Sequence, residues 1–252
     1  VINNPKDFVI GFFCQLLLLP IVAYILILIL NLPLEIALGL MIIAAAPGGV
    51  TTNVMTKFAN GDVALSISLT AVISLISIIS VPFIVLKSAD LLGVTNISAD
   101  ITMTAITLKM ALVVTVPVIL GMIIRKFADN FISSNISIVN KVTTALFIIV
   151  FAAIWIEERE NIFNYLKQAG FAVLVLNVVM MILAYYIAKF FATGMKQRKC
   201  IAIECGLQNG TLAVFVATQM FNDIAYMIPT AAYALIMYLT GFALIFILRR
   251  AN

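Results

Sequence analysis

The sequence predicts an all-α integral membrane protein that has polar breaks inside two of its spans. Of its 252 residues, 64% are hydrophobic and 10% are charged, and the mean hydropathy is +1.19. Runs of about 20 apolar residues, the length that crosses a bilayer as a helix, recur along the whole chain. Two of these runs are interrupted near their middle by proline, glycine and polar residues. This composition excludes an ordinary soluble domain.

We expect eight membrane spans that are joined by short connections. In chain order they cover residues 8–30, 34–58, 63–86, 102–124, 138–156, 169–191, 199–221 and 225–248. Turn-forming residues lie at 31–33, 60–62 and 222–223. Asp62 and Asp223 are placed to cap the helices that follow them.

The lysine and arginine residues predict the orientation of these spans. Eleven of the 15 fall on the side that holds both ends of the chain, and four fall on the other side. By the positive-inside rule the first side is cytoplasmic. We therefore expect a multi-pass protein of the cell membrane with both visible termini in the cytoplasm. Residue 1 is Val and no signal-peptide pattern precedes the first span, so we also expect N-terminal sequence to be missing.

Several functional classes lack their sequence signatures. The chain has no His, and its three Cys lie in or beside apolar segments, which does not indicate a disulfide framework. It has no glycine-rich phosphate loop and no zinc-protease pattern. Glu204 is the one acidic residue expected inside a span, so an aspartyl dyad is excluded. We expect neither an enzyme nor a nucleic-acid-binding protein, since loop charges account for the pI near 9.0.

The second and seventh spans are predicted to be broken helices. The second contains AAAPGGVTTN at 44–53, and the seventh contains IECGLQNGT at 203–211. Proline removes a backbone donor, and glycine adopts the conformations that an unwound segment needs. A simple kink is the alternative for either span alone, because Pro and Gly are common in membrane helices. Polar residues at both breaks favour a functional role.

The two broken spans also lie in similar surroundings. FANGDVA at 58–64 follows the second span, and FNDIA at 221–225 follows the seventh. Gln15 in the first span and Asn177 in the sixth are each followed by an Ala-Tyr pair. The first three spans and the last three thus form two similar triplets, which the predicted topology places in opposite orientations. Inverted repeats with paired broken helices are typical of secondary transporters that bind their cargo near the midplane.

Glu204 is the most informative residue of the sequence. A charge near the centre of a bilayer costs at least about 2.5–3.5 kcal/mol, so an intramembrane carboxylate indicates a functional site. Thr52 and Asn53 at the other break are further oxygen donors of the kind that a hard cation such as Na⁺ prefers. The alternative is a protonated structural carboxyl that pairs with Asn53 or Gln208.

Each break also exposes two kinds of backbone group. Free carbonyls near 44–47 and 203–207 suit a cation, whereas free N–H groups near 51–53 and 209–211 suit an anion. Ser66 and Thr70 share one face of the third span, and Gln15 is a lone amide in the first; for all three, interhelical packing is the alternative role. We expect an anionic substrate to face five residues at the breaks: Pro47, Gly48, Gly49, Asn209 and Thr211.

Three ordered motifs resemble the bile acid:sodium symporter family. They are PGG at 47–49 with Thr52 and Asn53 after it, NGDVALS at 60–66, and ECGLQN at 204–209. The resemblance implies a ten-helix inverted-repeat transporter with two broken, crossing helices, of which this chain shows eight spans as an N-terminally truncated member that lacks the first two. Residues 1–92 would be the core spans of the first repeat, 93–160 the panel spans and 161–252 the core spans of the second repeat, all in a single transporter domain.

The resemblance also implies two sodium sites that share Glu204. The first consists of Thr52, Asn53, Ser66, Thr70 and Glu204. The second consists of Gln15, Glu204, Gln208 and the backbone carbonyls of Cys205 and Leu207. Position 52 is often Ser in the family, and Thr keeps the hydroxyl. The segment 234–238 lacks the polar residues that some relatives carry, so it does not support a carry-over of substrate contacts.

Together these observations predict a sodium-coupled secondary active symporter of an organic anion that works by alternating access. The anion would be bile-acid-like or a small carboxylate, such as a keto acid. Na⁺ would be the co-transported ion, no organic cofactor is expected, and the partners would be the substrate and membrane lipid, with no oligomer required. Alternatives are a proton-coupled or uncoupled carboxylate carrier, and a channel.

Overall fold

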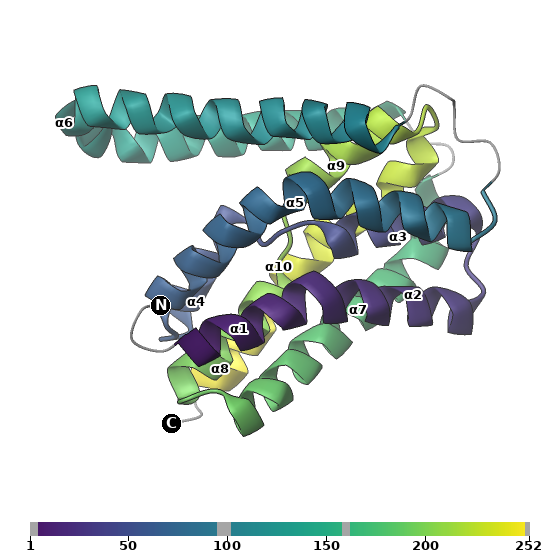
Figure 1. Cartoon of the computed structure of the whole chain (residues 1–252), viewed down its shortest axis with the longest axis horizontal. Helices are drawn as coiled ribbons and strands as arrows, with labels where there is room; N and C mark the ends of the chain where they lie inside the picture. The colour runs from purple at the N-terminus through teal and green to yellow at the C-terminus, as the bar shows by residue number, and fades with distance from the viewer. Residues whose placement is uncertain (1–4, 95–101, 158–161, 250–252) are drawn as a thin grey trace.

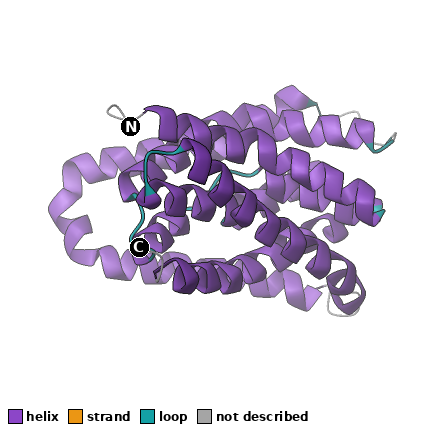
Figure 2. Ribbon diagram, turned by 90° about the horizontal axis from the view of Figure 1, so that it is seen from below, coloured by secondary structure: helices purple, strands orange, loops and turns teal. Residues whose placement is uncertain are grey.

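The described part of the structure is built from helices, as the sequence predicts. It is a computed structural model that describes residues 5–94, 102–157 and 162–249, and Figure 1 and Figure 2 show its helical architecture. The elements are α1 (Pro5–Phe13), η1 (Cys14–Leu18), α2 (Leu19–Leu30), α3 (Leu34–Ala45), α4 (Val50–Phe58), α5 (Val63–Leu91), α6 (Met103–Glu157), α7 (Ile162–Phe191), α8 (Met195–Gly206), α9 (Gly210–Met220), η2 (Ile224–Met227) and α10 (Ile228–Arg249).

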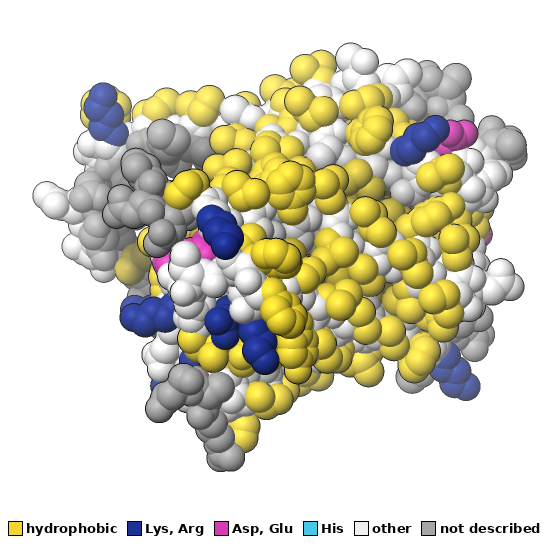
Figure 3. Space-filling view, turned by 60° about the horizontal axis from the view of Figure 1, so that its bottom comes forward, with side chains coloured by type: hydrophobic (Ala, Val, Ile, Leu, Met, Phe, Trp, Pro, Cys, Tyr) yellow, Lys and Arg dark blue, Asp and Glu magenta, His cyan; other side chains and the backbone are white. Residues whose placement is uncertain are grey.

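Four helical segments are long and apolar enough to cross a membrane. They are Pro5–Leu30, Val63–Leu91, Ala169–Phe191 and Ile224–Arg249. These segments match the first, third, sixth and eighth predicted spans. Figure 3 shows a broad apolar face with charged side chains gathered toward its two ends, the pattern of a surface in contact with lipid. α1 begins and α10 ends at the same end of the bundle (Figure 1), while the assignment of that end to the cytoplasm stays a prediction.

The first span is one continuous helix with a widened turn in it. Residues 14–18 form the π-helix η1, and the Leu19 N–H bonds to the Cys14 carbonyl. Pro20 follows immediately, and it cannot donate to the carbonyl four residues before it. A π turn next to the proline relieves this conflict, and such turns are frequent at functional sites. The turn carries Gln15, which is buried.

The second and seventh spans are broken, as predicted. α3 ends at Ala45, and Ala46 is extended (φ −65°, ψ 148°), the conformation that a following proline favours. α4 then begins after Gly49. In the seventh span, α8 ends at Gly206 and Leu207 is extended (φ −112°, ψ 113°) without any proline. Asn209 accepts a bond from the Leu212 N–H and so caps α9.

The predicted fourth and fifth spans both lie on the long segment α6. Ala128 has non-helical dihedrals (φ −132°, ψ 33°), and the chain turns back on itself in this region, as Figure 1 and Figure 2 show. The spans 102–124 and 138–156 lie on the two sides of this kink. α6 packs chiefly against α5 and α9. The side chains of Arg125, Arg159 and Arg250, which entered the orientation argument, lie outside the described residues.

The two capping aspartates are in their predicted places. Asp62 accepts from the Leu65 N–H at 3.0 Å, and Asp223 accepts from the Ala225 N–H at 2.9 Å. Asp62 also accepts from Gln197 at 2.9 Å, and this bond ties the start of α5 to α8. Asp62 thus joins two helices, whereas the Asp223 bond stays within its own turn.

Close helix packing depends on small residues, and Gly39 of α3 gives a test. A Cβ at Gly39 would overlap the backbone carbonyl of Tyr226 and lie 2.7 Å from Pro229 Cγ. Backbone cannot yield as a side chain does, so Gly39→Ala should lower the free energy of unfolding by about 1–3 kcal/mol. Gly170 of α7 has nothing within 4 Å of the same added atom. Gly170→Ala should be neutral or stabilising by up to about 1 kcal/mol. Thermal unfolding in detergent measures both, and equal midpoints would contradict the described packing.

Candidate cation site at the helix breaks

The two helix breaks lie against each other in the buried interior. The Asn209 N–H donates to the Pro47 carbonyl at 2.8 Å, and Gly48 pairs with Gln208 as an isolated antiparallel bridge. Backbone groups have no water to bond with inside a membrane, so each break satisfies part of the other. Because of this pairing, residues that are about 160 positions apart in the chain lie at the same point.

Glu204 is fully buried at this point, and three hydroxyl groups surround its carboxylate. Its Oε1 atom accepts from Ser66 at 2.5 Å, from Thr52 at 2.6 Å and from Thr70 at 3.2 Å, and Thr70 also lies 3.2 Å from Oε2. α4 supplies Thr52, α5 supplies Ser66 and Thr70, and α8 supplies Glu204. Asn53 joins the group through Ser66, whose hydroxyl lies 2.8 Å from the Asn53 Oδ1 atom.

All five residues of the first predicted sodium site therefore lie together: Thr52, Asn53, Ser66, Thr70 and Glu204. Its carboxylate contacts hydroxyls, not the amides of Asn53 or Gln208 that the structural alternative required. A hydrogen bond to a charged group contributes about 1.5–3 kcal/mol, so the three hydroxyls offset part of the cost, at least about 2.5–3.5 kcal/mol, of placing this carboxylate in a membrane. The group can hold a negative charge, and with it a cation.

Most of the second predicted set lies on the other side of Glu204. The Gln15 Nε2 group donates to the Glu204 backbone carbonyl at 3.2 Å and to the Gln208 Oε1 atom at 3.3 Å. The Gln208 Nε2 group lies 3.1 Å from the Cys205 carbonyl. The Oε1 atom of Gln15 is buried and has no partner among the described residues. A buried amide oxygen without a donor is available to a water molecule or to a cation.

Gly48 lies against residues of both predicted sodium sites. A Cβ at this position would lie 2.6 Å from Glu204 Oε2 and 3.0 Å from Gln15 Nε2. The backbone of the first break therefore closes over the carboxylate, and only a residue without a side chain leaves room for it.

The residues expected to face the substrate are distributed unevenly. Pro47, Gly48 and Gly49 are buried, Asn209 is half-buried and Thr211 is exposed. α9 is capped by Asn209, whereas α4 begins without a side-chain cap. Its first two residues, Val50 and Thr51, are exposed, Val50 to 78%. Among the described residues, the start of α4 is the more open of the two half-helix N-termini.

One polar cluster was not predicted. The Gly206 carbonyl accepts from the Asn177 Nδ2 group at 2.6 Å and from the Tyr233 hydroxyl at 3.0 Å, and Thr240 lies 2.6 Å from the Asn177 Oδ1 atom. The sequence offered one signal, since Asn177 occupies the place in the predicted second triplet that Gln15 occupies in the first. Tyr233 and Thr240 lie in an apolar stretch where nothing in the sequence separates them from packing residues.

Comparison with known proteins now identifies the family. The sequence model of the Sodium Bile acid symporter family matches residues 1–165, which is more than half of the chain. The chain belongs to this family.

Several relatives match nearly the whole chain. It is 29% identical to an uncharacterized sodium-dependent transporter of Bacillus subtilis (strain 168), YocS, over 96% of this chain and 73% of that protein. It is 27% identical to a probable sodium/metabolite cotransporter of Arabidopsis thaliana, the chloroplastic BASS1, over 99% of this chain and 61% of that protein. The rice BASS2 protein is 28% identical over 96% of this chain and 56% of its own length. The chain thus spans between about half and three quarters of these relatives.

Adjacent glycines in the first break allow a matched test of this site. Gly48→Ala would place a methyl group against Glu204 and Gln15, and it should remove most of the stabilisation that Na⁺ gives the protein. Gly49→Ala brings ordinary contacts, the nearest at 3.4 Å to the Thr51 Oγ1 atom, and should keep that stabilisation. The measurement is the shift in thermal unfolding midpoint between NaCl and choline chloride at equal ionic strength. The same shift in both variants would contradict the site.

Proposed function

We propose that this member of the sodium bile acid symporter family is a sodium-coupled carrier for an organic anion. The observation that carries the proposal is the fully buried Glu204 carboxylate, which lies among hydroxyl and amide oxygens where the two helix breaks meet. The names of the bacterial and plant relatives, which describe sodium-dependent transport and sodium/metabolite cotransport, support the same function.

In the first predicted sodium site, the pairs of oxygen atoms within hydrogen-bonding distance outnumber the hydroxyl hydrogens that could lie between them. A hydroxyl has one hydrogen to donate. The Thr52 hydroxyl lies within bonding distance of both the Gly49 carbonyl (2.8 Å) and Glu204 (2.6 Å). The Ser66 hydroxyl lies within bonding distance of both the Asn53 Oδ1 atom (2.8 Å) and the Glu204 Oε1 atom (2.5 Å). Each hydroxyl can donate to only one of its two neighbouring oxygens, and the other pair of oxygens is left without a hydrogen between them. Two such oxygens repel each other, and a sodium ion that contacts both would relieve the repulsion.

The unpartnered Oε1 atom of Gln15 supports a second sodium ion. It lies beside the Glu204 and Gln208 groups, and in the present arrangement the Gln208 Nε2 group bonds to the Cys205 carbonyl. An ion at this site would draw in the Gln15 oxygen and the Cys205 carbonyl, and the Gln208 side chain would turn its oxygen inward. This second set would complete its coordination with the Leu207 carbonyl.

Two sodium ions and one carboxylate would leave a net positive charge, which suits an anionic substrate. The start of α4 adds to this preference, because it is uncapped by any side chain and exposes Val50 and Thr51. The positive end of a helix dipole favours an anion. We place the carboxylate or sulfonate group of the substrate at this end of α4, next to the paired breaks.

The transport step would be a movement of the core helices against α6. In this scheme residues 1–92 and 161–252 form the core, and residues 93–160 form the panel. The chief contacts of α6 are with α5 and α9, a limited attachment that supports such a movement. Ions at the two sites would fix α4, α5, η1 and α8 around the paired breaks, so that the loaded core moves as one unit.

A proton-coupled carrier is the nearest alternative, in which Glu204 takes a proton in place of sodium. A proton on Glu204 would bridge one more oxygen pair of the first set. It would leave the Oε1 atom of Gln15 without a partner, and this atom therefore favours sodium. A channel would need a continuous polar path. Counterflow of labelled substrate, which a carrier shows and a channel does not, separates the two.

Removal of the Glu204 charge tests the proposed function. Glu204→Gln keeps the shape of the side chain but removes the charge that both ions share, so sodium-driven uptake should fall to its level in choline. The same variant should lose the sodium-dependent shift in thermal unfolding midpoint. Proteoliposomes with an inward sodium gradient, given labelled taurocholate or pyruvate, measure the first effect.

Glu35→Gln is the matched control, because Glu35 lies in the first turn of α3, at the opposite end of that helix from the break. It should retain both sodium effects. Uptake by Glu204→Gln that still follows the sodium gradient would overturn the proposal. Wild-type uptake that follows a proton gradient equally well in choline would favour the proton-coupled carrier.

A further inference from the structure

The broken seventh span has a second set of polar contacts on its other side, away from the Glu204 carboxylate. The Gly206 carbonyl accepts two hydrogen bonds, from Asn177 of α7 at 2.6 Å and from Tyr233 of α10 at 3.0 Å. Asn177 and Tyr233 are both fully buried. A carbonyl oxygen has two lone pairs, so these two donors use the whole capacity of the Gly206 oxygen.

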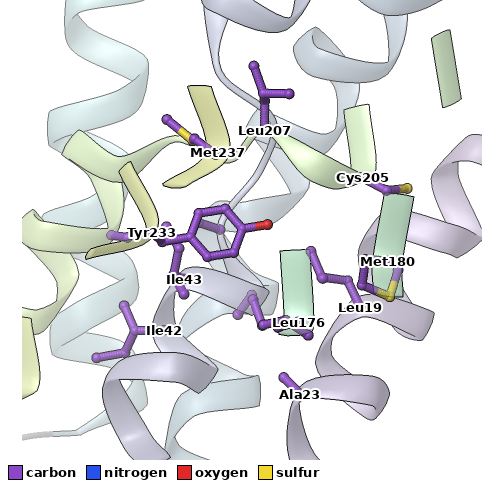
Figure 4. Packing of buried hydrophobic residues seen from close by; sticks show 14 of the residues in the cluster. Leu19, Ala23, Ile42, Ile43, Leu176, Met180, Cys205, Leu207, Tyr233 and Met237 are labelled. Atoms are coloured by element: carbon purple, nitrogen blue, oxygen red, sulfur yellow. The ribbon is translucent and has the colours of Figure 1, made fainter. Parts of the chain in front are cut away.

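The surrounding packing holds this arrangement in place. Figure 4 shows the Tyr233 hydroxyl directed toward the segment that carries Cys205 and Leu207, away from Ile42 and Ile43. A Cβ at Gly206 would overlap the Met181 side chain, so the backbone of the break lies directly against α7. The Thr240 hydroxyl lies 2.6 Å from the Asn177 Oδ1 atom, and a bond there directs the Nδ2 group toward Gly206.

These contacts fix the peptide plane between Gly206 and Leu207 at both ends. Its oxygen is held by Asn177 and Tyr233, and its nitrogen donates to the Ile203 carbonyl at 3.0 Å. A glycine at this position would otherwise allow the plane to rotate at little cost. The planes on either side carry the Cys205 and Leu207 carbonyls, and both are members of the second predicted sodium set.

The amide side chains of two helices therefore engage alternate carbonyls of the break. Gln15 donates to the Glu204 carbonyl and Asn177 donates to the Gly206 carbonyl. The carbonyls between and after them, those of Cys205 and Leu207, are the ones that the second ion would use. Glu204, Cys205 and Gly206 form the last turn of α8, and Leu207 follows it in an extended conformation. A helix supplies no N–H donors of its own to the carbonyls of its last turn, so their partners must come from side chains such as Gln15, Asn177 and Gln208, or from an ion.

We propose that Asn177, Tyr233 and Thr240 are positioning residues that set the sodium affinity of the second site by holding the Gly206 carbonyl away from it. They touch neither ion nor substrate. They act by orienting the Cys205 and Leu207 carbonyls, as outer residues orient the ligands of a metal. The inference rests on the proposed function, because it assigns a role at one of the two proposed sodium sites.

A sodium titration of the full chain in detergent tests the assignment. The thermal unfolding midpoint is followed as NaCl replaces choline chloride at constant ionic strength, and the sodium concentration for half of the shift is recorded. Asn177→Ala should raise this concentration about 10-fold, the usual effect of losing an outer-shell partner. Tyr233→Phe, which removes one hydroxyl, should raise it about 3-fold, and Thr240→Val by a similar or smaller factor.

Thr230→Val is the matched control on the same helix. Thr230 is fully buried in α10, and its hydroxyl has no partner among the described residues, so the isosteric change removes no hydrogen bond. It should leave the half-saturating sodium concentration unchanged. A purely structural role for the cluster would lower the midpoint in choline but would not move the sodium concentration, so the titration separates the two roles.

Double variants show which of the two proposed sodium sites these residues affect. Tyr233→Phe should combine non-additively with Gln208→Ala, a residue of the second site, and additively with Thr52→Val, a residue of the first. Should Asn177→Ala fail to fold, Tyr233→Phe and Thr240→Val still give the result. Unchanged sodium concentrations in these variants, with a normal wild-type response, would overturn the inference alone. Absence of any wild-type response to sodium would overturn the proposed function and, with it, the inference.

Discussion

The structure depends on the contact between two interrupted helices in a place where water is not available. A break exposes carbonyl and N–H groups that must be satisfied inside the protein. Here the Pro47 carbonyl accepts from Asn209, and Gly48 pairs with Gln208. This pairing brings α4 and α8 together, and the Glu204 side chain is fully buried beside it. The hydroxyls of Thr52, Ser66 and Thr70 are then required as partners for the carboxylate, and the other contacts of the site follow from this requirement.

The two breaks have different chemistry although their surroundings are similar. The first contains Pro47 and two glycines but no charge, and it presents the open end of α4. The second contains Glu204, and its carbonyls are engaged by amides from η1 and α7. Charge and ordered carbonyls favour a cation, whereas an open helix start favours an anion. In the proposed function the second break therefore supplies the carboxylate and the carbonyls of the ion sites, and the first supplies Thr52 and Asn53 together with most of the substrate site.

The sequence was sufficient for the features that have local signals. Prolines and glycines predicted the breaks, a charge in an apolar run predicted the buried carboxylate, and helical spacing predicted that Ser66 and Thr70 share a face. The π turn at 14–18 is explained by Pro20 once it is seen, but a proline in a membrane helix permits several responses, so the turn could not be predicted. Tyr233 and Thr240 were missed because their role depends on the position of Gly206, which tertiary packing sets and no local pattern records.

Gln15 and Asn177 occupy corresponding places in the two triplets that the sequence predicts. A strictly symmetric pair of repeats would direct Gln15 to the seventh span and Asn177 to the second. Instead, both donate to the seventh span, two residues apart, to the carbonyls of Glu204 and Gly206. The one carboxylate explains this convergence, because the break that carries the charge needs its backbone held in a single arrangement. A mobile backbone there would let the buried charge find competing partners. The uncharged break has no such requirement, and among the described residues its Gly48 is held by backbone pairing with Gln208 and not by an amide side chain from the first or sixth span.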